Sequence, residues 1–140
     1  MNMKTEEVFQ ELFNYLGTQL SNVLLNPYGA MLYPYENPGF TMPCIVMKQI
    51  DFSFNNENLS HEEQLFALAI EVNIFAQDMT VSKRTIANSL SDLINDVLFN
   101  QYGLRIDDRN PIPNIDPSIY RIYMRFSCVI DENKIIYRTR

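Results

Sequence analysis

The chain has 140 residues, 46% of them hydrophobic, which is enough for one ordinary globular domain with its own core. No stretch approaches the roughly 18 consecutive apolar residues of a membrane-spanning helix, and the N-terminus lacks the basic and apolar regions of a signal peptide. The net charge of −6 argues against a nucleic-acid-binding protein, which normally carries a basic patch. We therefore expect a protein made and used in a cytoplasm, with no membrane partner and with Cys44 and Cys128 as reduced, buried thiols.

The first periodic segment, residues 5–25, predicts an amphipathic helix with one face on the core. Its apolar residues recur every four positions, at Val8, Leu12, Leu16, Leu20 and Leu24. Thr5 is predicted to cap the N-terminus. Asn26-Pro27 is predicted to end the helix, because the residue before a proline is pushed out of helical geometry.

Residues 26–43 predict a long loop that is rich in prolines and aromatic rings and has little periodicity. Its aromatic candidates for partner contact are Tyr28, Tyr33, Tyr35 and Phe40. Loops of this length are often functional, and tyrosine is enriched at protein interfaces. We expect these rings to contact a partner protein. The alternative is a loop that only folds back on its own core.

Alternating apolar residues predict two strands, 44–54 and 66–76, which form an antiparallel hairpin with a polar tip. A second helix is predicted to start near Thr80 or Ser82 and to end at a left-handed Gly103. Its core stripe is Ile86, Leu90, Leu93, Ile94, Val97 and Leu98.

A turn-rich connection, 107–117, is then predicted to lead into a last hairpin, 120–130 and 135–138. The expected fold is a single α+β domain over 1–140, an antiparallel sheet of four or five strands with two helices packed on one face. Its element order is α-β-β-α-β-β. The predicted core includes Leu12, Leu16, Ile70, Val72, Leu90, Ile94, Ile122 and Phe126.

Chemistry-bearing residues are sparse. His61 has neither a second imidazole nor a thiolate near it in sequence, and Asp107, Asp108 and Asp116 lack the spacing of a calcium loop. Neither cysteine has a nearby histidine or a CxxC partner. We expect no catalytic, cofactor or metal site, and so not an enzyme. The alternative is a small-molecule-binding or hydrolytic domain with a site near Asp107, Asp108 and His61.

The C-terminal run 115–131, with the closing 135–138, resembles the final strands of small tail-completion proteins of long-tailed bacteriophages. Residues 69–76 and the helix that ends at Gly103 are similar to the central strand and second helix of that family. The resemblance implies a tail terminator or head-tail joining protein in the tail or neck of a virion, assembled in the bacterial host cytoplasm. Such proteins form rings, commonly hexamers, that cap the tail tube and bridge it to the head. Another neck or minor capsid adaptor is the alternative.

The resemblance also implies the partners. They are the chain itself, the tail-tube protein and the head-tail connector proteins, with DNA only as passing cargo.

Charge is divided unevenly along the chain. Residues 1–78 hold ten acids and two bases, and residues 79–140 hold seven acids and nine bases. Such asymmetry suits head-to-tail association, although it can also arise by chance among solvated charges. We predict that the bases Arg121, Arg125 and Arg138 of one subunit meet the acids Glu57, Glu62 and Glu63 of the next. Arg121 and Arg125 project from the same face of their strand. That face is in contact with solvent, with a layer of helices or with a neighbouring subunit.

Overall fold

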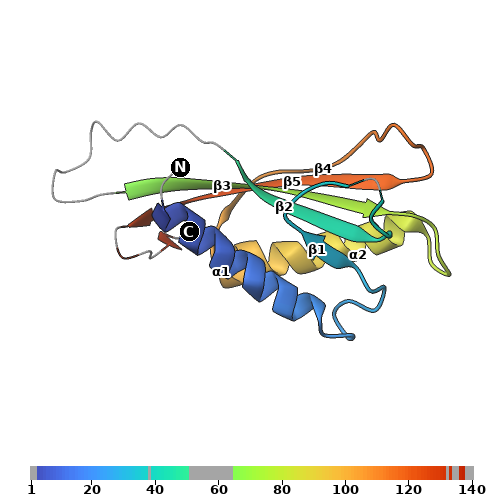
Figure 1. Cartoon of the computed structure of the whole chain (residues 1–140), viewed down its shortest axis with the longest axis horizontal. Coiled ribbons are helices and arrows are strands. Elements are labelled where there is room, and N and C mark those ends of the chain that lie inside the picture. The colour runs from blue at the N-terminus through green and yellow to red at the C-terminus, as the bar shows by residue number, and fades with distance from the viewer. Residues whose placement is uncertain (1–2, 38, 51–64, 132, 134–135, 138–140) are drawn as a thin grey trace.

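A computed structural model describes residues 3–37, 39–50, 65–131, 133 and 136–137. Two helices cover one face of a mostly antiparallel sheet, and the opposite face is open (Figure 1). This confirms the predicted α+β fold. The elements in chain order are α1 (Met3–Leu20), β1 (Met31–Tyr33), β2 (Cys44–Ile50), β3 (Leu65–Ala76), α2 (Lys83–Asn95), the π-helical turn η1 (Asp96–Gln101), β4 (Arg105–Ile112), β5 (Tyr120–Asp131) and β6 (Ile136–Tyr137).

The sheet has the strand order β1-β2-β3-β5-β4, and the two-residue β6 pairs with β5. Every described pair is antiparallel except β1 and β2, which run parallel. The five longer strands and the two helices therefore follow the order α-β-β-β-α-β-β. The predicted order lacked one strand between the first helix and the first hairpin.

The first helix ends at Leu20, five residues before the predicted end. Asn26 explains the early stop, because its buried side chain organises the turn that follows. The Asn26 Nδ2 donates to the carbonyls of Leu20 and Ala30, both at 2.9 Å, and the Ala30 N–H donates to Asn26 Oδ1 at 3.0 Å. The predicted Thr5 cap is also wrong. Thr5 lies inside the first turn, buried, and its Oγ1 accepts a hydrogen bond from Gln49 Nε2.

The first predicted hairpin is confirmed in its two strands, since β2 and β3 pair antiparallel. Its polar tip lies outside the described residues. The second helix is confirmed as well: the Ser82 side chain caps it, accepting from the Thr85 N–H at 3.3 Å. After η1, Gly103 adopts φ +79°, a conformation that disfavours any residue with a Cβ.

The predicted connection 107–117 is wrong in its first half, because Arg105–Ile112 forms β4. This strand pairs with β5 at the edge of the sheet and carries a register shift between Ile106 and Asp108. An edge strand tolerates Pro111, whose missing N–H need not pair with a second neighbour. Within the predicted return strand 135–138, the described residues Ile136–Tyr137 form β6, and the other two lie outside the described residues.

The core lies between the two helices and the sheet. All eight predicted core residues are buried, each at most 3% exposed. Cys44 and Cys128 are free and buried. Burial raises the pKa of the Cys128 thiol from 9.0 to about 12. Burial, with a smaller contribution from the charge on Glu36, raises the pKa of the Cys44 thiol to about 11. Both residues are therefore protonated thiols at neutral pH.

Candidate protein-protein interface

The aromatic rings of residues 26–43 divide into two groups. Tyr28 is half-buried and packs against the core. The other three form an aromatic cluster: Tyr33 stacks on Phe40 at 3.6 Å between ring centroids, and Tyr35 lies 5.5 Å from Phe40. Tyr35 remains 56% exposed. The segment thus folds partly back on its own domain and still leaves an aromatic surface in solvent.

An apolar pocket lies beside this cluster on the open face of the sheet. We call it the open-face pocket; its volume is about 350 Å³, and segments 36–42 and 114–119 line it together with β2 and β3. Buried Cys44 and Val46 form its floor. Phe40, Phe75 and Ile115 add apolar walls, and the Ile115 side chain is fully exposed to solvent.

Two exposed acidic residues, Glu36 and Asp116, also line the open-face pocket. The Ser118 N–H and hydroxyl donate to Asp116 Oδ1 at 2.9 and 2.7 Å, and these hydrogen bonds lower the pKa of the Asp116 carboxyl. Asp116 is therefore charged at neutral pH. Within the described part of the chain, the Glu36 carboxylate has no hydrogen bond or ion pair. The pocket combines an apolar floor with a negatively charged rim.

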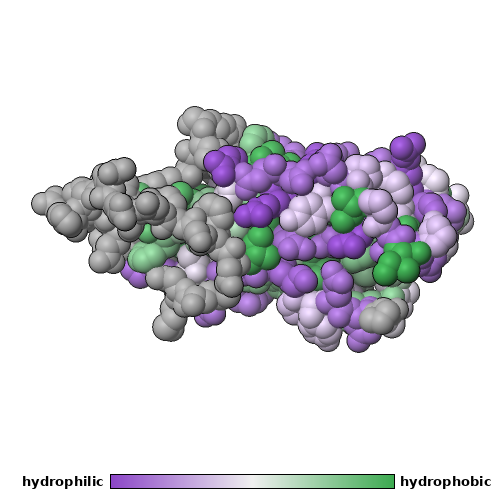
Figure 2. Space-filling view, turned by 90° about the horizontal axis from the view of Figure 1, so that it is seen from above, coloured by the Kyte–Doolittle hydropathy of each residue, from purple (hydrophilic) through white to green (hydrophobic). Residues whose placement is uncertain are grey.

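Two of the predicted arginines, Arg121 and Arg125, lie on the open face of the sheet, opposite the core side chains Ile122 and Phe126. The sequence left three environments open for that face, and no helix among the described residues covers it (Figure 1). Seen from above, this side of the molecule is mostly hydrophilic, with isolated hydrophobic residues (Figure 2). Arg121 and Arg125 belong to this polar surface.

Both arginines have partners within the chain. Arg121 Nε donates to Asn73 Oδ1 at 2.9 Å, and the Arg121 guanidinium lies 5.2 Å from the centroid of the Phe75 ring. Arg125 is the cross-strand partner of Glu71. The Arg121 contacts join β5 to β3 across the open face. The role of both arginines at an interface stays a prediction. Arg138, Glu57, Glu62 and Glu63 lie outside the described residues.

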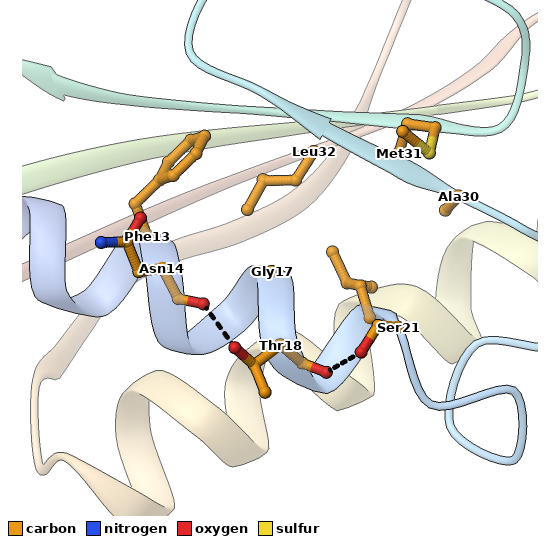
Figure 3. Close-up of a pocket in the computed structure, with 9 residues that line it drawn as sticks. Phe13, Asn14, Gly17, Thr18, Ser21, Ala30, Met31 and Leu32 are labelled. Atoms are coloured by element: carbon orange, nitrogen blue, oxygen red, sulfur yellow. Dashed lines mark hydrogen bonds between the residues drawn. The ribbon is translucent and has the colours of Figure 1, made fainter.

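A second apolar surface is the groove between α1 and β1, with a volume of about 630 Å³ (Figure 3). Phe13 from α1 and Leu32 from β1 extend into the same space. The Thr18 hydroxyl donates to the Asn14 carbonyl at 3.0 Å, and the Ser21 hydroxyl donates to the Thr18 carbonyl at 2.6 Å. Because these hydroxyls bond back to the helix, the groove offers mainly apolar contact. No charged residue lines it to select a partner.

Of the residues considered for chemistry, the described aspartates are not grouped into a site. Asp107 pairs with Arg105 at 2.6 Å, and Asp108 accepts a hydrogen bond from Asn110 on the same strand. Asp116 lies in the following loop, and His61 is outside the described residues. Within the described ranges, no three His, Cys, Asp or Glu residues are grouped to hold a metal ion. No described helix is long and apolar enough to cross a membrane.

Sequence reasoning missed the open-face pocket and its rim residue Glu36. The weak signal was the placement of exposed apolar residues, above all Ile115, among prolines and aspartates in a turn-rich segment.

No protein-family model matches this chain, and no curated protein matches it significantly.

Proposed function

We propose that this chain is a structural assembly protein of a phage or prophage particle, acting as a tail terminator or head-tail joining protein. The observation that supports this best is the aromatic cluster beside the open-face pocket. Tyr35 and Ile115 keep large apolar side chains in water at one end of an otherwise polar sheet face. Exposed apolar groups gathered around a pocket are typical of protein contact sites.

In this proposal the chain works by assembly and not by catalysis. Copies of the chain associate into a ring that caps the tail tube and contacts the head-tail connector in the virion. By its resemblance to tail-completion proteins, we expect six copies in the ring. DNA passes through without being held, since an acidic chain of net charge −6 repels phosphates. A different neck or minor capsid adaptor would share the self-contact but not the binding to tail tubes, so co-sedimentation with purified tubes separates the two roles.

Sedimentation velocity of the wild-type chain and of Tyr35→Ala tests the proposal. Tyr35 is 56% exposed, so its removal should leave the monomer folded while it weakens self-association. Met79→Ala is the matched control, because Met79 is 52% exposed and lies outside the aromatic cluster. A wild-type chain that sediments as a monomer at every concentration would contradict the proposal.

A further inference from the structure

We infer that the open-face pocket accepts the Arg84 side chain of a second copy of this chain. The inference rests on the proposed self-assembly and names the contact that drives it. The pocket has the features that a guanidinium on an aliphatic stem requires. Phe40 and Val46 offer apolar surface to the stem, and the Glu36 carboxylate is available to the cation.

Charge complementarity selects a basic side chain over a purely apolar one. Glu36 is exposed and, in the described part of the chain, has no hydrogen bond or ion pair that would neutralise it. Asp116 lies on the same rim but already has the Lys83 cation near its carboxylate, so Glu36 is the carboxylate that a partner's cation would meet. A planar guanidinium donates to carboxylates and stacks on aromatic rings, of which Phe40 and Phe75 line the pocket, and this favours arginine over lysine.

Among the exposed arginines of the described ranges, Arg84 is the one without an ion pair or a hydrogen bond to the rest of the chain. Of the exposed bases in the described ranges, Arg105 pairs with Asp107 and Arg109 pairs with Asp92. Arg84 has neither an ion pair nor a hydrogen bond there. It lies in the first turn of α2, next to Lys83, whose Nζ donates to the Pro117 carbonyl at 3.0 Å beside the pocket residue Asp116.

Arg84 and the pocket are two different surface features of the same chain. A single contact between them leaves one copy with a free pocket and the other with a free arginine, which is a heterologous contact. Repetition of such a contact closes into a ring when its rotation permits.

Charge reversal and restoration test this contact. Arg84→Glu and Glu36→Arg should each weaken the interface at least about fivefold, as expected for loss of an exposed charge pair with added repulsion. The variant that carries both changes should regain most of the wild-type association, because the charges then match again. Glu11→Arg, an exposed carboxylate on α1, is the matched control and should associate as wild type. Oligomer mass by sedimentation velocity is the readout, with circular dichroism to verify folding.

The outcomes separate this inference from the proposed function. A wild-type oligomer that is insensitive to both single reversals, or a combined variant no better than the single ones, overturns the Arg84 contact and leaves assembly standing. A wild-type chain that stays monomeric overturns the proposed function. It also rules out a second copy of the chain as the partner of the pocket.

A further measurement does not depend on assembly. NMR titration of the full chain should show that N-acetylarginine amide shifts residues of the pocket at lower concentration than N-acetylcitrulline amide, its uncharged isostere. Glu36→Gln should remove the preference. Equal effects of the two probes on the wild-type chain would overturn the inference.

Discussion

The turn that follows α1 depends on a single buried side chain, and Asn26→Ala tests that dependence. Asn26 is 4% exposed and makes three hydrogen bonds, to the Leu20 carbonyl and to both backbone groups of Ala30. Each such bond contributes about 1 kcal/mol net, and the backbone groups that lose it stay buried. We expect the substitution to lower the free energy of unfolding by about 3 kcal/mol.

Asn22→Ala is the matched control for this prediction. Asn22 is exposed and its Oδ1 accepts one hydrogen bond, from the Leu24 N–H at 3.0 Å, so its loss should cost under about 1 kcal/mol. Urea unfolding measures both. With a slope of about 2 kcal/mol per M, Asn26→Ala should move the midpoint by about 1.5 M. Equal midpoints for the two variants would refute the assignment of the turn to Asn26.

Three further predictions concern the thiols, the second helix and the open face. Because the pKa of Cys128 is raised from 9.0 to about 12, the unfolded chain loses its proton first, so stability should fall as pH rises from 9 towards 12. Cys128→Ser should show a smaller fall in pH-dependent urea melts, and an identical fall would contradict burial as the cause. Ser82→Ala removes the cap of α2 and should cost about 1 kcal/mol, whereas the exposed Asn88→Ala should cost less than half of that. Arg121→Ala breaks the bond to Asn73 and the ring contact with Phe75, so thermal melts should show a loss of about 1–2 kcal/mol; an unchanged melting temperature would mean that Arg121 does not support the sheet.

The long periodic segments allowed most of the fold to be predicted. The stripes of α1 and α2 and the alternation in β3 and β5 each repeat over many residues, so one irregular position does not hide them. The end of α1 was misplaced because Asn26 acts through a side chain that reaches six residues back. Such a contact leaves no periodic trace.

The two missed strands lie at opposite edges of the sheet. β1 has three residues, too few for alternation, and it pairs parallel to β2 across a ten-residue loop. β4 contains Pro111 and paired aspartates, which read as turn residues and are tolerated because the outer edge of the strand needs no partner in the sheet. At both edges, tertiary pairing decided the structure against the local signal.

The candidate interface was predictable only in part. The composition of residues 26–43 pointed to its rings, and strand alternation placed Arg121 on the open face. The open-face pocket could not be foreseen from the sequence. Glu36 and Asp116 are 80 positions apart, and they line the same pocket only because the strands of the sheet pair as they do. The contact of Arg121 with Phe75 was equally hidden. It follows from the register in which β3 and β5 pair, which sets those two residues opposite each other.

Counting the copies in the assembled particle tests self-assembly most directly. Native mass spectrometry of the full wild-type chain, at concentrations spanning three orders of magnitude, measures that number without assuming a shape. The proposed role predicts one dominant oligomer of fixed copy number, six by the family resemblance. In Arg84→Glu that oligomer should require a higher protein concentration, and adding Glu36→Arg should reverse the shift. A monomer throughout the range, or a broad series of masses with no preferred copy number, would contradict a closed ring.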